Sequence, residues 1–206
     1  MKITGLKQQI KNADRVSIFV DEKYSFSLTL DDILQHKLKK GLELSEADVF
    51  VYKKLSTDGK LRARAYEWLM GRPHSTRELT DYLRRKKAEP ELVQKLVQDF
   101  TQKGTLNDAY FADWFYEKSI RKNKSIRAVQ NELRSKGIDT LTIQSIVSRE
   151  ENVNTEAEAL NQLITKLSSR PRYADQAKLM RYLLSKGFSY HDVKDALSLR
   201  IPEQEP

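Results

Sequence analysis

Residues that could catalyse a reaction or bind a metal are scattered along this chain. None of the 206 residues is cysteine, which excludes disulfides, thiolate metal ligands and cysteine nucleophiles. The three histidines, His36, His74 and His191, fall in separate segments, and none has a partner at the spacing of metal ligands or of a catalytic base. No glycine-rich phosphate-binding motif occurs. The sequence therefore predicts a protein that is not an enzyme and that uses no metal or cofactor.

Two pairs of adjacent carboxylates have simpler explanations than acid–base catalysis. Asp31 and Asp32 stand at a predicted helix start, where negative charge is favoured. Glu150 and Glu151 lie in a charged link between two predicted helical segments. An enzyme would need a convergent polar pocket, and the sequence does not reveal one.

Basic side chains are better organised than these groups. The net charge is +8, and residues 58–137 hold most of it, with 18 basic and 11 acidic residues. Residues 1–57 carry a net charge of +2 and residues 138–206 a net charge of −1. A concentrated positive field favours a polyanion, usually nucleic acid, or an acidic protein surface. The alternative is a solvated basic face that only aids solubility.

Charge clustering selects the candidate binding residues. They fall at the ends of predicted helices and in the loops between them. Lys86 could stabilise a helix end rather than bind a ligand, because lysine recurs at the equivalent positions 136 and 186. The candidates for binding DNA or a protein–DNA filament are Arg72, Arg84, Arg85, Lys86, Lys87, Arg121, Lys122, Lys124, Arg127 and Arg134.

Reading of DNA bases by a helix-turn-helix is not expected. Such proteins use the start of the third helix of a three-helix unit, and here those starts carry Glu89 and Glu91, and Asp139. Phosphate contacts from the second helices remain open. Aromatic residues interleaved with the basic ones could stack on bases, although helical cores explain them more simply. They are Tyr66, Trp68, Tyr82, Tyr110, Trp114 and Tyr116.

The elements that must position these side chains begin with a β segment. Apolar residues alternate over 16–20 and 24–28, which predicts a hairpin joined at Asp21-Glu22-Lys23, and residues 3–10 are a plausible third strand. A short helix is expected from Asp31 or Asp32 through Leu38. Ser45 to Asp48 resembles a capping box before a second helix, whose apolar face would be Phe50, Val51 and Leu55.

From about residue 58 a pattern repeats every 50 residues. Leu83, Leu133 and Leu183 mark it, and apolar residues also match four positions before and ten and fourteen positions after each leucine. We interpret this as three tandem repeats of three helices, since stacked units can share a continuous apolar seam. The helices are expected at 60–71, 76–87 and 90–103; 108–121, 126–136 and 140–150; and 155–168, 174–186 and 190–200.

The predicted fold is thus mainly α. An elongated, curved array of three repeats follows a small β-containing segment. The expected boundaries are 1–57 for the β-hairpin and short-helix segment, 58–107, 108–153 and 154–201 for the repeats, and 202–206 for a frayed tail. A start without a signal-peptide pattern, together with the lack of cysteine and of long apolar runs, favours the cytoplasm.

Several strings in this order resemble the RecX family. Residues 104–112, GTLNDAYFA, are similar to its junction between the first and second repeats, and residues 132–138, ELRSKGI, to its second-repeat signature. Ser75 to Leu83 matches its first-repeat pattern, and Leu38 to Gly41 resembles its N-terminal part. The resemblance is strongest over 58–138. Ser125-Ile126 departs from it, because the family commonly has a Gly-Pro or Gly-basic pair there.

The resemblance implies a function. RecX proteins bind the RecA–DNA filament, lie in its groove and inhibit its recombinase, ATPase and co-protease activities, so a role in regulating recombination and the SOS response is expected. It also implies a monomer that contacts single-stranded DNA within the filament and binds DNA weakly alone. From the residues alone, a stand-alone nucleic-acid-binding helical module remains an alternative, and it predicts tight, salt-dependent binding to naked nucleic acid.

Overall fold

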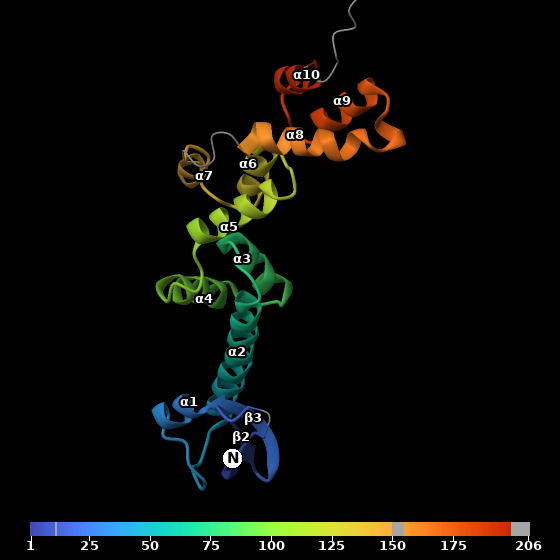
Figure 1. Cartoon of the computed structure of the whole chain (residues 1–206). Coiled ribbons are helices and arrows are strands. Elements are labelled where there is room, and N and C mark those ends of the chain that lie inside the picture. The colour runs from blue at the N-terminus through green and yellow to red at the C-terminus, as the bar shows by residue number, and fades with distance from the viewer. Residues whose placement is uncertain (11, 150–154, 199–206) are drawn as a thin grey trace, which may run out of the picture. The chain divides into compact units, whose positions relative to one another are not determined.

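The structure is a computed structural model that describes residues 1–10, 12–149 and 155–198. The chain forms two compact units, one of Met1–Arg72 with Leu83–Leu96 and the other of Pro73–Tyr82 with Val97–Pro206. Helices dominate, after a short run of strands at the N-terminus (Figure 1). The expected link at Glu150-Glu151 and the expected tail at 202–206 lie outside the described residues.

A three-stranded antiparallel sheet opens the first unit. It consists of β1 (Ile3–Gln8), β2 (Arg15–Val20) and β3 (Lys23–Thr29) in the order β1-β2-β3. Asp21 and Glu22 connect β2 to β3 with φ angles of 48° and 65°. Two consecutive residues with positive φ match the twist of a tight hairpin. The predicted hairpin and third strand are confirmed.

Two helices follow the sheet, and each begins at a capping box. Helix α1 (Leu30–Gln35) starts at Thr29, whose hydroxyl accepts from Asp32 N, and it ends before the predicted Leu38. Helix α2 (Glu46–Met70) starts at Ser45, with Asp48 completing the box as expected. Each box satisfies amide groups that the first turn of a helix leaves unpaired.

Helix α2 corrects two expectations. The break expected near residue 58 is absent, because Gly59 lowers helix stability without ending the helix. The predicted apolar face is wrong at Phe50 and Val51, which are 71% and 56% exposed, and right at Leu55, which packs against the core beside the sheet. Helix α2 packs against β3 (Figure 1), and the residues that it contributes to this core are Val49, Tyr52 and Leu55.

A buried arginine joins the sheet to α2. Arg15 Nη2 donates to the carbonyl oxygen of Ser27 at 2.6 Å and to that of Ser56 at 3.4 Å. The pKa of the Arg15 guanidinium is lowered, because burial outweighs the opposing interactions with Asp32 and Tyr24. Gly59 permits this packing, because a Cβ there would lie 3.3 Å from Arg15 Nη1.

The remaining helices agree with the 50-residue pattern. Each described helix lies in its predicted range, and most of its ends fall within one or two residues of the predicted ends. A short 3₁₀ helix, η2 (Pro171–Tyr173), was not predicted. The helices are α3 (Thr76–Arg85), α4 (Pro90–Gln102), α5 (Asp108–Ile120), α6 (Ile126–Ser135), α7 (Thr140–Val147), α8 (Thr155–Ser168), α9 (Gln176–Ser185) and α10 (Tyr190–Ser198).

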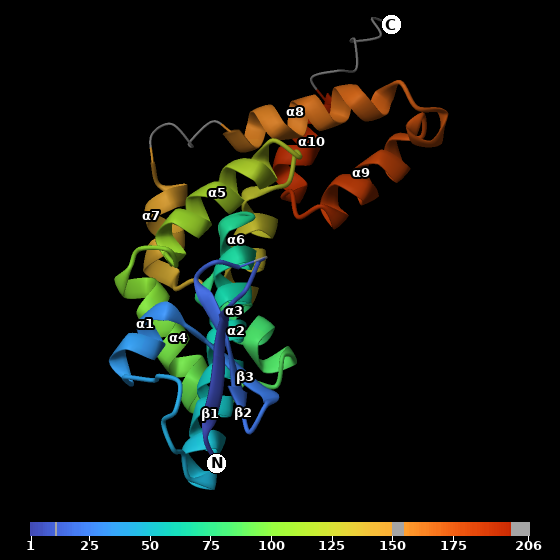
Figure 2. The same cartoon turned by 90° about the horizontal axis from the view of Figure 1, so that it is seen from below.

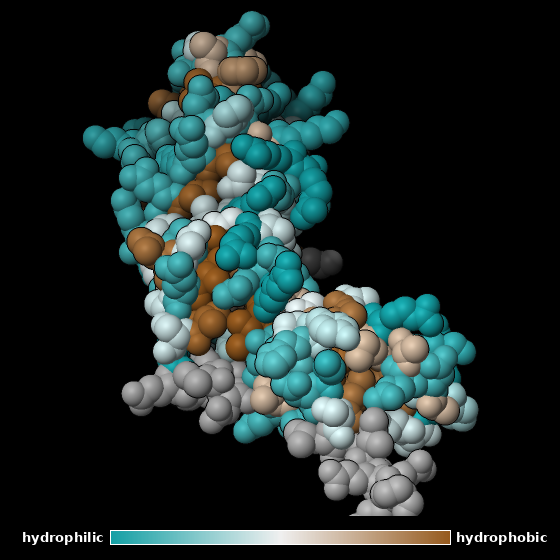
Figure 3. All heavy atoms as spheres, turned by 90° about the horizontal axis from the view of Figure 1, so that it is seen from above, coloured by the Kyte–Doolittle hydropathy of each residue, from teal (hydrophilic) through white to brown (hydrophobic). Residues whose placement is uncertain are grey.

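Separate small cores support the repeats. Leu83, Leu133 and Leu183 are each fully buried. Leu133 packs in a cluster with Phe111 of α5, whereas Leu183 packs in another with Ile164 of α8. The helices α8, α9 and α10 of that second cluster lie together in Figure 2. On the face drawn in Figure 3, hydrophilic residues border narrow strips of hydrophobic ones, as small cores would leave them.

Candidate nucleic-acid interface

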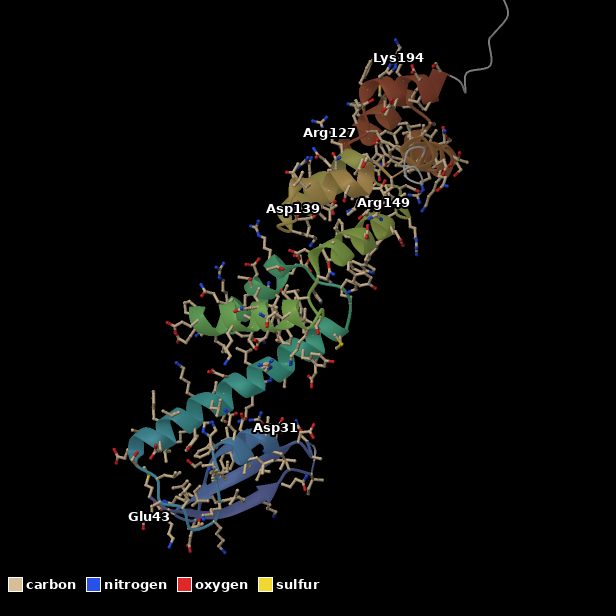
Figure 4. The ribbon with its side chains drawn as sticks, turned by 90° about the vertical axis from the view of Figure 1, so that its left-hand side faces the viewer. Asp31, Glu43, Arg127, Asp139, Arg149 and Lys194 are labelled. Atoms are coloured by element: carbon tan, nitrogen blue, oxygen red, sulfur yellow. The ribbon has the colours of Figure 1, made fainter. Side chains whose placement is uncertain are left out.

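The second helices of the first two repeats present arginines at equivalent exposed positions. On α3 these are Arg77 and Arg84, and on α6 they are Arg127 and Arg134. Residues seven apart lie on the same side of a helix, so each helix carries its pair on one face. Figure 4 shows Arg127 extending from α6.

The opposite face of each helix is apolar and buried. Leu79 and Leu83 of α3, like Val129 and Leu133 of α6, have no exposed surface. A helix anchored by such a stripe holds its outward arginines in place. The two pairs therefore occupy equivalent, outward-facing positions of α3 and α6.

The third repeat lacks this feature. On α9 the positions equivalent to the arginine pair are Ala177 and Leu184. Residues 138–206 also carry the net charge of −1. Among the residues that the structure describes, the exposed arginine pair thus occurs on α3 and α6 and not on α9.

Some predicted site residues are exposed and some are already paired within the chain, and Lys86, Arg121 and Arg134 are both. Lys124 Nζ bonds both carboxylate oxygens of Glu132, at 2.5 and 2.7 Å, and Arg121 Nη2 bonds Glu117 at 2.9 Å. Arg72 is half-buried and, like Lys86, takes part in interactions within the chain. The predicted residues that stand exposed are Arg84, Arg85, Lys86, Lys87, Arg121, Lys122, Arg127 and Arg134.

Arg77 was missed as a candidate. It lies outside the dense run of charges at 84–87, so charge clustering did not select it. The 50-residue period pairs it with Arg127 and would have found it. The repeat period combined with side-chain exposure is a better guide to candidate binding residues than charge clustering, because residues exposed at equivalent positions of two repeats can share a role.

The third helix of the second repeat begins with an acidic cap, as expected. Asp139 precedes α7, and its carboxylate accepts from Thr142 N at 2.9 Å and from Thr142 Oγ1 at 2.6 Å (Figure 4). These bonds lower the pKa of Asp139. An ionised carboxylate at this end would repel phosphates, which supports the view that α7 does not read bases.

Most of the interleaved aromatic residues serve cores. Tyr116 is 3% exposed, and Trp114 packs on Phe111 with Lys118 Nζ 4.3 Å from its ring centre. Tyr66 and Tyr110, by contrast, are 48% and 64% exposed. Those two alone among the six predicted residues present large exposed surface for stacking on a base.

A cavity of about 390 Å³ in the third repeat has acidic walls. It lies between α8 and α10 and is lined by Glu156, Asp192 and Asp195, with Leu160 also contributing. Burial and the negative charge of Asp192 raise the pKa of Glu156, and a hydrogen bond from Ile126 N opposes this shift. The cavity is unsuited to a polyanion.

Groups suited to metal binding do not converge in the part of the chain that the structure describes. No cluster of three or more histidine, aspartate or glutamate side chains with ligand geometry occurs among those residues. His74 is buried, and its Nδ1 lies 3.1 Å from Glu78 Oε2, while Lys136 Nζ bonds the other oxygen of Glu78 at 2.6 Å. Over the same residues, no helix is long and apolar enough to cross a membrane.

Comparison with known proteins gives one consistent result. Residues 1–45 match the family model "Regulatory protein RecX N-terminal domain", and residues 155–197 match the model of the third three-helix domain of RecX. The chain is 32% identical to regulatory protein RecX of Bacillus pumilus, over 98% of this chain and 79% of that protein. It is also 32% identical to RecX of Listeria innocua, over 95% and 74%. The chain belongs to the RecX family.

Solved RecX structures show the same fold. A crystal structure of regulatory protein RecX aligns with 96% of this chain and 98% of its own, with a TM-score of 0.72 at 22% identity. RecX from Lactobacillus salivarius aligns with 69% and 95%, with a TM-score of 0.57. The mainly helical architecture after an N-terminal sheet is therefore shared with RecX proteins.

The departure from the usual RecX turn at Ser125-Ile126 leaves a well-formed helix start. Ser125 is fully buried, and its hydroxyl accepts from Ala128 N at 3.1 Å as the N-cap of α6. Ile126 N donates to Glu156, a bond that a proline at this position could not make. The substitution thus supplies contacts of its own.

Replacing Lys87 by glycine is expected to stabilise the protein. Lys87 has a φ of +59°, at the position where the other two repeats have Gly137 and Gly187. A side chain in this left-handed region costs about 1–2 kcal/mol, partly offset by the entropy that glycine loses on folding. We expect Lys87→Gly to raise the free energy of unfolding by about 0.5–1 kcal/mol in urea titrations. Lys86→Gly is the control and should not stabilise; equal effects would contradict this account.

Replacing Glu156 by glutamine is expected to change how stability depends on pH. Because the pKa of Glu156 is raised in the folded state, its ionisation reduces stability as pH rises through and above the ordinary glutamate range. The amide oxygen of the glutamine would still accept from Ile126 N without carrying charge. We expect Glu156→Gln to gain stability over the wild type between about pH 4 and pH 7, as measured by denaturant unfolding. A difference that is constant with pH would refute the assignment.

Proposed function

We propose that this RecX-family chain binds the RecA–DNA filament and inhibits its recombinase, ATPase and co-protease activities by binding rather than by catalysis. The observation that carries the proposal is the repeated arginine pair on α3 and α6. Arginine forms charge-assisted hydrogen bonds to phosphate, and two pairs on successive repeats suit a ligand with regularly spaced phosphates.

The third repeat has a different proposed role. With Ala177 and Leu184 at the equivalent positions and an acidic cavity between α8 and α10, it is suited to protein rather than DNA. We assign it contacts with the recombinase. Binding that favours a blocked or shortened filament is sufficient for inhibition, because a ligand shifts an equilibrium by its differential affinity for the two states.

Further parts of the proposal rest on the family. The three repeats act in the cytoplasm as an elongated monomer that lies in the filament groove. The protein contacts single-stranded DNA within the filament, and its affinity for DNA alone is weak. The predicted division into repeats at 58–107, 108–153 and 154–201 belongs to this proposal. No cofactor is invoked.

Co-sedimentation with preformed RecA filaments over a salt series tests the proposal, with naked single-stranded DNA as the control. We expect the chain to pellet with filaments at salt concentrations that already release it from naked DNA. Because phosphate contacts weaken as salt rises, any binding that persists must come from protein contacts. Equal salt sensitivity for both ligands would favour the stand-alone nucleic-acid-binding module, and no filament association would end the proposal.

A further inference from the structure

Two buried serines that lie 50 residues apart in the sequence make equivalent pairs of hydrogen bonds. Ser75 Oγ accepts from Glu78 N at 3.2 Å and donates to the carbonyl oxygen of Lys136 at 2.8 Å. Ser125 Oγ accepts from Ala128 N at 3.1 Å and donates to the carbonyl oxygen of Lys186 at 2.9 Å. Each serine therefore caps its own helix and also bonds the end of the corresponding helix in the next repeat.

The next amide along the chain adds a second bond of the same kind. Thr76 N donates to Asp108 Oδ1 at 2.7 Å, and Ile126 N donates to Glu156 Oε1 at 3.1 Å. Both acceptors lie in the first turn of the next repeat's first helix. The start of each of these second helices is thus attached at two points to the repeat that follows.

Glycines allow the close approach at both joints. A Cβ on Gly137 would lie 3.0 Å from Arg77 Cβ, and a Cβ on Gly187 would lie 2.5 Å from Ser125 Oγ. Both glycines also have positive φ angles, of 83° and 94°. The serine, the amide and the glycine form one recurring joint, and each of its parts recurs with the period of the repeats.

The third repeat replaces the serine by aspartate. Asp175 is exposed, and its carboxylate accepts from Ala177 N at 2.8 Å and from Lys178 N at 3.4 Å. Aspartate is as good a helix cap as serine, but when ionised it cannot donate a hydrogen bond. Capping is therefore retained at this position, while a donor to a following repeat is not.

We propose that Ser75 and Ser125 are positioning residues that set the register between consecutive repeats, and that Asp175, which caps α9 without a donor, makes no such joint. This inference rests on the proposed function, because the Ser75 joint would fix the spacing between the arginines of α3 and those of α6. The Ser125 joint would fix the protein-binding third repeat against the second. The Ser75 hydroxyl would thus link phosphate recognition in the first repeat to that in the second.

Replacing Ser75 by aspartate tests the joint separately from the cap. The carboxylate keeps the acceptor for Glu78 N but removes the donor to Lys136 and places negative charge against its carbonyl oxygen. Thr76→Pro is a second variant, since proline is well tolerated at the first helical position and lacks the amide that bonds Asp108. Asp175→Ser is the matched control at the equivalent position of the third repeat.

A distance measurement between spin labels gives the first readout. The chain has no cysteine, so labels can be attached through Asp81→Cys and Asn131→Cys, on the exposed faces of α3 and α6. We expect a narrow distance distribution in the wild-type background and in Asp175→Ser, and a broader or displaced one with Ser75→Asp or Thr76→Pro. An unchanged distribution in both joint variants would overturn the inference, whether or not the chain binds DNA.

The second readout is the affinity of the protein for single-stranded DNA as a function of oligonucleotide length. A serine with a purely structural role would not affect this length dependence. We expect wild-type affinity to rise once the DNA is long enough to reach both arginine pairs, and Ser75→Asp to lose about 10-fold of that gain while binding the shortest DNA normally. Ser125→Asp should keep the gain. An equal length dependence in wild type and Ser75→Asp would overturn the positioning role, whereas no wild-type binding to filament or DNA would count against the proposed function itself.

Discussion

Replacing Arg84 and Arg134 together by glutamate is expected to lower affinity for single-stranded DNA and for the filament about 100-fold at low salt. The two arginines stand at equivalent positions of α3 and α6. Each substitution removes one expected phosphate contact and adds a repulsive charge, and each should lower the affinity by a factor of roughly 10. Both side chains are exposed, so the fold should not change. Fluorescence anisotropy over a salt series measures the effect, and the slope of log affinity against log salt should fall by about 2.

The control for this experiment carries the same change in charge elsewhere. Lys53 and Lys54 are exposed on the first half of α2, away from the repeated positions. Replacing both by glutamate should reduce affinity only slightly, through the general field of the protein. If the two double variants lose affinity equally, net charge rather than the arginine pairs governs binding.

Truncating Leu133 to alanine is expected to destabilise the second repeat by about 3–5 kcal/mol, because its fully buried side chain would leave a cavity beside Phe111. Leu183 belongs to a different cluster, with Ile164. We expect Leu183→Ala to have a similar effect, and the two losses to be nearly additive, since distant sites in separate cores do not share contacts. Hydrogen exchange should place each loss in its own helices.

Leu141→Ala provides the surface control, because Leu141 is 77% exposed on α7. It should change the free energy of unfolding by less than about 0.5 kcal/mol. Exchange that accelerates uniformly over α5–α10 in Leu133→Ala would show a single cooperative core, contrary to the separate clusters of the structure.

The repeats were predictable from the sequence because their signals are local. Leu83, Leu133 and Leu183 recur with the apolar spacing of helices, and Gly137 and Gly187 stand where a left-handed residue ends a helix. The errors also have local causes. The phase of α2 was set by Phe50 and Val51, although hydrophobic residues at a helix surface are common and only the sheet decides which side is buried.

The candidate site was predicted less completely, because charge in a sequence does not show which side chains are already paired. Lys124 was counted as available, yet it bonds Glu132 eight residues away. The joints could not be predicted at all, since Ser75 and Lys136 are 61 residues apart, and a capping serine has the same sequence pattern whether or not its hydroxyl reaches another repeat. Arg77 could have been found from its 50-residue spacing to Arg127, but charge clustering did not select it.

Inhibition of RecA-promoted strand exchange, measured as the chain is added to preformed filaments, tests the central claim most directly. If the repeats bind the filament through phosphate and protein contacts, exchange should stop at amounts well below one chain per recombinase subunit, and the Arg84→Glu, Arg134→Glu variant should require far more protein. Inhibition only when the chain is in excess over the DNA, and to the same extent with a recombinase-free strand-annealing control, would contradict the account.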